Sequence, residues 1–159
     1  VRADRLAKAG KADLIAKAVE IMKETKLPVG VGAHALQTVM DCERVKAGAE
    51  FYLKTLHHHN YKTGPRAGEA ADDYKEFPGY WCGKPQETID FMKSVQKPWI
   101  AFKVMAAGAI PPKDAFRYSF ENGADFIVAG MFDFEVREDV GIVKDILTSQ
   151  PKRSRPWRG

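Results

Sequence analysis

The sequence has few cysteines and no long hydrophobic segment, and both absences narrow the class of protein. Its two cysteines, Cys42 and Cys82, match no Cys-X-X-Cys spacing, so they predict neither a disulfide framework nor a zinc site. No run of about 18 apolar residues is present, which argues against a membrane-spanning helix. The Gly-rich dinucleotide fingerprint and the P-loop are also missing. Hydrophobic residues make up 45% of the 159 residues, which is enough for the core of about one domain.

Positive charge is concentrated at one end of the chain. The final segment, PKRSRPWRG, holds four basic residues, which equals the whole net charge of +4. We therefore expect a domain over 1–149 followed by a solvated basic tail over 150–159, and we do not expect a nucleic-acid-binding surface. The chain begins with Val1 rather than methionine, which leaves open a targeting segment before it; without a visible signal peptide, the cytoplasm is the default location.

Apolar residues recur alternately with strand-like and helix-like spacing along the whole chain. The pattern predicts strands near 28–33, 50–56, 98–105 and 125–130, each followed by a helix. Strands that alternate with helices are typical of a parallel sheet with helical crossovers. The predicted fold class is therefore α/β, with four parallel strands in sequential order.

The chain also repeats a pair of local patterns. Pro28 and Pro98 each open a predicted strand and lie 70 residues apart, while Gly48 and Gly123 lie 75 residues apart, each followed by alanine, an acidic residue and phenylalanine. Two strand–helix modules therefore occur twice, a doubling that is typical of α/β barrels and related repeat folds.

The segment KVMAAGAIPPKDAFRYSFENGADFIVAGMF, residues 103–132, resembles the last two strand–helix units of TIM barrels. The resemblance implies a (βα)4 half-barrel, the C-terminal half of the eight-stranded barrel, and phosphate binding at Gly108, Ala109 and Gly130. Two features depart from the phosphate pattern. Ala109 replaces the second glycine of the usual turn, and the acidic Asp133 and Glu135 follow Gly130.

Four strands are half of what a closed barrel needs, so the inner face of such a sheet requires a cover. We expect either a homodimer or a missing N-terminal half-barrel. The alternative fold is a small doubly wound sheet of the flavodoxin type, which usually has five strands.

Several polar residues fall at the predicted carboxyl ends of the strands, the catalytic face of α/β barrels. Lys54 and Lys103 lie within predicted strands, and a lysine buried there is costly unless it has a partner or a function. The stretch FKVMAAGAI resembles the lysine-bearing strand of deoxyribose-phosphate aldolase-like enzymes, offset by two residues. With His34 and His58 as acid/base groups, Lys103 and Lys54 are the predicted catalytic residues for lyase or isomerase chemistry on a small polyhydroxy or keto compound, either phosphorylated or not.

Two further interpretations stay open. The stretches PVGVGAH and FYLKTLHHHNY loosely resemble sugar isomerase-like barrels, which implies a divalent metal held by His34, His57, Asp133 and Glu135. Alternatively the chain is a non-catalytic interaction domain. The long segment 61–85 then presents aromatic residues to a partner, or it closes as a lid over a substrate; these residues are Tyr74, Phe77, Tyr80 and Trp81.

Overall fold

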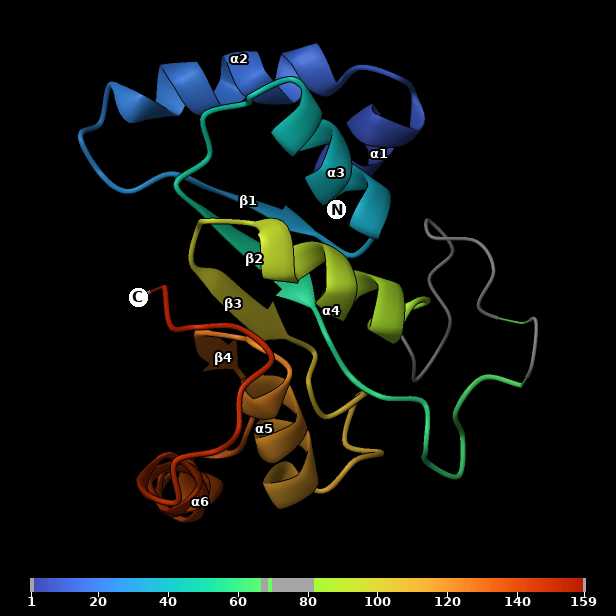
Figure 1. The fold of residues 1–159 in the computed structure, drawn as a ribbon, viewed down its shortest axis with the longest axis vertical. Coiled ribbons are helices and arrows are strands. Elements are labelled where there is room, and N and C mark those ends of the chain that lie inside the picture. The colour runs from blue at the N-terminus through green and yellow to red at the C-terminus, as the bar shows by residue number, and fades with distance from the viewer. Residues whose placement is uncertain (1, 67–68, 70–81, 159) are drawn as a thin grey trace.

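The computed structural model describes residues 2–66, 69 and 82–158, and these form an α/β fold with four parallel strands (Figure 1). The aromatic residues of the predicted lid lie outside the described residues. None of the helices in the described part of the chain has the length and apolar character that crossing a membrane requires. In chain order the elements are α1 (Arg2–Lys8), α2 (Ala12–Lys23), β1 (Gly30–Ala33), α3 (Leu36–Arg44), β2 (Phe51–Thr55), α4 (Pro85–Ser94), β3 (Trp99–Phe102), α5 (Pro112–Glu121), β4 (Phe126–Val128), the 3-10 turn η1 (Asp133–Glu135) and α6 (Val136–Thr148).

The sheet order is β1-β2-β3-β4, and every neighbouring pair is parallel, as the sequence predicts. The strands are shorter than expected, and β3 ends at Phe102, so the prediction that Lys103 lies inside this strand is wrong. Lys103 adopts a φ of 56°, a left-handed conformation that a strand does not accommodate. Lys103 is the first residue after the strand.

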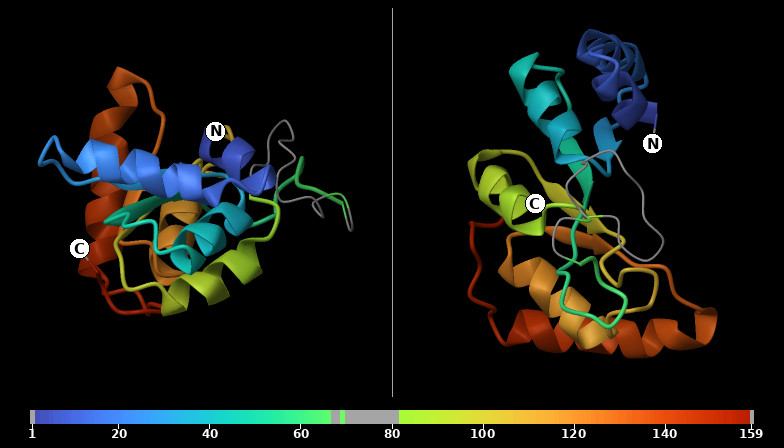
Figure 2. Two further views of the ribbon diagram at one scale, coloured as in Figure 1. Left: turned by 90° about the horizontal axis from the view of Figure 1, so that it is seen from above. Right: turned by 90° about the vertical axis from the view of Figure 1, so that its right-hand side faces the viewer.

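The two faces of the sheet differ in their cover. Strand residues alternate in direction, and Val31, Tyr52 and Trp99 are buried on the face toward the helices, where the Tyr52 hydroxyl donates to Glu43 of α3. In Figure 2 the helices form an arc around one side of the sheet, from α2 beside β1 to α6 beyond β4. On the opposite face Phe126 and Val128 remain 49% and 53% exposed.

The repeat in the sequence corresponds to a repeated backbone link between strands. The N–H of Glu50 donates to the carbonyl of Val29, and the Glu50 carboxylate accepts the N–H of Val29 at 2.8 Å. Asp125 makes the same reciprocal pair with Trp99, its carboxylate lying 2.9 Å from the Trp99 nitrogen. The acidic residue of each Gly-Ala-acidic-Phe pattern therefore links the starts of two neighbouring strands. Glu50 links β2 to β1, and Asp125 links β4 to β3.

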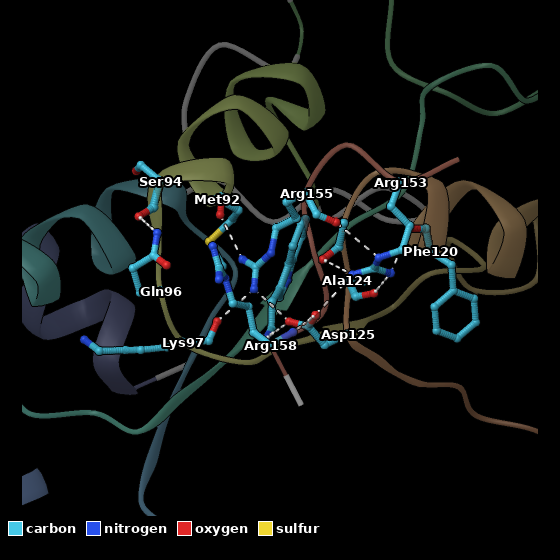
Figure 3. A network of polar contacts seen from close by, with 12 residues as sticks. Met92, Ser94, Gln96, Lys97, Phe120, Ala124, Asp125, Arg153, Arg155 and Arg158 are labelled. Atoms are coloured by element: carbon cyan, nitrogen blue, oxygen red, sulfur yellow. Dashed lines mark hydrogen bonds and ion pairs between the residues drawn. The ribbon is translucent and has the colours of Figure 1, made fainter. Parts of the chain in front are cut away.

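The C-terminal segment is not a solvated basic tail. Arg155 is only 4% exposed, and its guanidinium donates to Asp125 at 2.8 Å and to the carbonyls of Met92 and Lys97 (Figure 3). Arg153 also donates to Asp125, at 3.1 Å, while its guanidinium stacks on the Trp157 ring. Charge compensation by a buried carboxylate and backbone carbonyls explains how these arginines leave water.

Candidate functional site

A cavity of about 830 Å³ opens at the carboxyl ends of β3 and β4. One wall is the connection from β3 to α5, and the other is the segment from β4 to the first turn of α6. Five residues predicted as site residues line it: Lys103, Gly108, Ala109, Gly130 and Glu135. The structure therefore brings together the predicted phosphate-binding residues, one predicted catalytic lysine and one predicted acidic residue.

The connection from β3 to α5 has an unusual backbone. Lys103, Ala106 and Ala107 have φ values of 56°, 47° and 59°, in the left-handed region that L-residues with a side chain rarely adopt. Gly108 follows at 87°, where glycine alone avoids a steric cost. Left-handed geometry costs about 1–2 kcal/mol for each residue that carries a Cβ. Strain of this kind often accompanies functional sites, and these residues lie in the connection that forms one wall of the cavity.

Asp139 is a cavity residue that the sequence analysis missed. It lies in the first turn of α6, is 4% exposed, and makes no hydrogen bond or ion pair within the described part of the chain. Burial raises the pKa of the Asp139 carboxyl group, and the neighbouring Glu135 and Glu138 add to the effect. A buried acidic residue with a raised pKa that lines the same cavity as a lysine is a candidate proton donor. The only sequence signal was its place shortly after the fourth strand.

Lys54 lies elsewhere, on the helix-covered face of the sheet. It is 1% exposed, and its ammonium group donates to the carbonyl and the hydroxyl oxygen of Thr55, at 3.0 and 2.9 Å. The Thr55 hydroxyl in turn donates to the carbonyl of His34. Lys54 does not line the cavity, so the structure separates it from Lys103.

His57 and His59 hold the chain beyond β2 to the segment around Cys82. The N–H of Cys82 donates to Nε2 of His57, so the proton of the neutral ring sits on Nδ1, which faces the carbonyl of His58 at 3.0 Å. His59 approaches the Cys82 carbonyl through its Nε2. Burial lowers the pKa of His57 to about 4, which keeps the ring neutral at neutral pH. These contacts give His57 and His59 a structural role as a clip across the long connection from β2 to α4.

His58 and His34 take separate positions. The His58 ring lies against Tyr118 of α5, with ring centroids 5.1 Å apart, and burial lowers its pKa although Asp114 opposes the shift. The His34 ring lies tilted against Phe102, which lines the cavity, with ring centroids 5.0 Å apart. The His34 backbone N–H donates to Asp4 of α1, which also accepts from Ala35 and Thr38 and so takes the place of a side-chain cap at the start of α3.

The predicted metal ligands do not converge in the described residues. In that part of the chain no group of three or more histidine, cysteine or acidic side chains could hold a metal ion. His57 is fully buried in the clip, whereas Asp133 is exposed and accepts the N–H of Phe134. His34, His57, Asp133 and Glu135 therefore do not form a metal centre here.

Comparison with protein-family models, with curated proteins and with solved structures found no match to this chain. The structure supports the α/β class with four parallel strands, and no relative supports a closer assignment within that class.

Proposed function

We propose that the cavity beyond β3 and β4 is the active site of an enzyme that acts on a small carbonyl compound. The observation that carries the proposal is that Lys103 and Asp139 line one cavity at the carboxyl end of a parallel sheet, where α/β barrels place their active sites. An amine and a buried carboxyl group in one cavity are the two groups that imine chemistry needs. We assign lyase or isomerase activity on a polyhydroxy or keto compound.

In the proposed reaction the neutral amine of Lys103 attacks the carbonyl carbon and forms a C–N bond. The carbonyl oxygen takes one proton from the attacking amine nitrogen and one from Asp139 in its protonated form, and it leaves as water. The resulting iminium carbon accepts the electron pair released when a neighbouring C–C or C–H bond breaks. Bond cleavage gives lyase chemistry, and proton transfer between neighbouring carbons gives isomerase chemistry.

Borohydride trapping tests this assignment. The protein is incubated with glyceraldehyde, reduced with sodium borohydride and mapped by mass spectrometry of its peptides. We expect the reduced adduct to concentrate on Lys103 and to be lost at that position in Lys103→Met. Lys113→Met, which removes an exposed lysine ten residues away outside the cavity, should trap as the wild type does. Adducts spread evenly over the surface lysines would refute the active site.

We also propose that the sheet is one half of an eight-stranded barrel. The parallel order β1-β2-β3-β4, the arc of helices on one side and the exposed Phe126 and Val128 on the other support this architecture. In a closed barrel one helix lies between each pair of neighbouring strands, which gives eight positions. Here α2 and α6 flank the two edges of the sheet, so the complementary half must bring four strands but only three helices.

A second copy of the chain is a poor complement by this count. Each copy has five helices from α2 to α6, so two copies supply ten helices for eight positions. Where the edge strand of one copy would pair with that of the other, α2 of one copy and α6 of the other would occupy the same position. We therefore favour a separate four-stranded half over the homodimer that the sequence also allowed. Sedimentation of the chain alone at micromolar concentration should show no discrete closed dimer. A two-fold dimer with β1 and β4 protected from hydrogen exchange would contradict the proposal.

A further inference from the structure

The amide groups beside the cavity are occupied by the chain itself. The N–H of Gly108 donates to the carbonyl of Met105 at 2.9 Å, and that of Ile110 donates to the same carbonyl at 3.0 Å. Ala109 donates to the carbonyl of Ala106 at 3.3 Å. A phosphate site at a glycine-rich turn depends on such N–H groups pointing at the ligand. These three N–H groups donate to carbonyls within the loop, so they are not available to bind a phosphate group.

The start of α5 is equally poor in donors. Pro111 and Pro112 occupy its first positions and have no N–H, while the amides of Asp114 and Ala115 both donate to the carbonyl of Pro111. A helix start normally offers several unsatisfied N–H groups to an anion. Two prolines at that place remove the feature that makes a helix start attractive to phosphate.

The opposite wall of the cavity carries negative charge. Glu135 and Asp139 both line it, and they lie four residues apart, which places them on the same side of the first turn of α6. One oxygen of Glu135 already accepts the N–H of Phe132 at 2.8 Å, so a carboxylate of the chain takes the place that a bound anion would have there. Lys103 is the single lysine or arginine among the lining residues, which include these two acidic residues.

Asp139 also provides a positive indication of the ligand. Asp139 is 4% exposed, lines the cavity, and makes no hydrogen bond within the described residues. Leaving a buried carboxyl group without a partner costs free energy that a ligand hydroxyl group would recover by donating to it. Resting on the active site proposed above, we infer that the site takes an uncharged polyhydroxy carbonyl compound through Asp139 and rejects the phosphorylated form.

Competition between two matched aldehydes tests the inference. Glyceraldehyde and glyceraldehyde 3-phosphate are trapped with borohydride at equal concentration, and the adduct at Lys103 is quantified for each. We expect glyceraldehyde to react faster by about tenfold or more, because repulsion between the phosphate and the Glu135 carboxylate disfavours the phosphorylated compound. The Glu135→Gln variant, which keeps an oxygen acceptor for Phe132, should reduce this ratio severalfold. Asp145→Asn makes the same charge change at an exposed position of α6 outside the cavity and should leave the ratio unchanged.

The outcomes separate the two proposals. An adduct at Lys103 that forms equally well or better with the phosphorylated aldehyde overturns the inference and leaves the active site standing. If neither aldehyde forms an adduct concentrated at Lys103, the active site itself is wrong, and the inference falls with it. A preference for glyceraldehyde that Glu135→Gln and Asp145→Asn change to the same extent also counts against the inference, because the preference would then reflect overall charge.

Discussion

The two copies of the sequence repeat share a backbone link but differ at both ends of their strands. At the amino end, Glu50 is exposed, whereas Asp125 is 5% exposed and binds two arginines from the C-terminal segment. At the carboxyl end, α1 fills the space beyond β1 through Asp4, whereas the space beyond β3 and β4 is an open cavity. The first repeat is therefore covered by α1 at the carboxyl end of its strands, whereas the second repeat is open there. The second repeat has the more extensive network of ion pairs at the amino end of its strands, around Asp125.

This difference indicates a division of roles within one sheet. The cluster of left-handed residues after β3 and the buried Asp139 without a partner among the described residues reduce stability, and both lie in the second repeat. The paired network around Asp125 lies in the same repeat at the other end of the strands. Proteins commonly tolerate such costs at a functional site when the rest of the structure offsets them.

The largest expected effect compares the two equivalent acidic residues. Asp125→Ala removes the carboxylate shared by Arg153 and Arg155 and leaves both guanidinium groups in the interior, so we expect a loss of about 3–5 kcal/mol in the free energy of unfolding. Glu50→Ala removes the same backbone link at an exposed position and should cost about 1 kcal/mol. Urea denaturation of both variants measures the difference, and equal losses would show that the arginine network adds nothing.

The next effect concerns pH and the clip at the end of β2. His57 has its pKa lowered from 6.5 to about 4 in the folded chain, so the unfolded state binds a proton more readily between these pH values. Stability should therefore be complete above about pH 6.5 and fall by about 3 kcal/mol as the pH drops to 4.

Urea denaturation at several pH values measures this dependence, with His57→Gln as the comparison. The variant should lose much of the slope between pH 6.5 and 4, although it is less stable at every pH. An unchanged slope in the variant would assign the acid sensitivity to other groups.

A smaller effect is expected at the paired glycines. Gly123 has a φ of 102°, and a Cβ there would lie 2.6 Å from Cγ of the buried Arg155. Gly48 has a φ of 75°, and its closest neighbour would be the end of the flexible Lys23 side chain at 3.5 Å. We expect Gly48→Ala to cost about 1 kcal/mol and Gly123→Ala about 2–3 kcal/mol. Thermal denaturation of both variants measures the difference. Equal losses of stability would show that Arg155 moves aside to make room for the added Cβ.

The smallest effect on stability is expected at the proposed nucleophile. Lys103→Met exchanges a half-buried lysine at the cavity for an apolar side chain of similar length, so the free energy of unfolding should change by less than about 1 kcal/mol. Trapping at this position should nevertheless disappear. A melting temperature lowered by more than about 8 °C would instead identify Lys103 as a structural residue.

The sequence predicted the four strands well because their residues carry a local signal. Aromatic and branched residues, the prolines at 28 and 98, and the glycines at 48 and 123 act within a few positions of the chain. The same patterns predicted the parallel order. They did not predict where β3 ends. The alanines after it adopt left-handed backbone conformations, for which alanine gives no local sequence signal and which depend on the surrounding structure.

The candidate site was harder to predict, because it depends on which distant groups meet. Five of the predicted site residues line one cavity, namely Lys103, Gly108, Ala109, Gly130 and Glu135, and their predicted roles stay predictions. Lys54 and His57 instead make hydrogen bonds outside this cavity, to Thr55 and Cys82. The sequence signal for Asp139, its place shortly after the fourth strand, was weak because an acidic residue in the first turn of a helix is common.

The sequence by itself determined the alternation of strands and helices, the internal repeat and the α/β class, since the spacing of apolar residues within each segment indicates which side chains are buried. The tertiary structure decided which charges are buried and what they meet. Arg155 reaches Asp125 across 30 residues of chain, and it leaves water only because that carboxylate and two backbone carbonyls receive it. Asp139 became a candidate acid for the opposite reason, because folding buries it beside a cavity with no partner in the described chain.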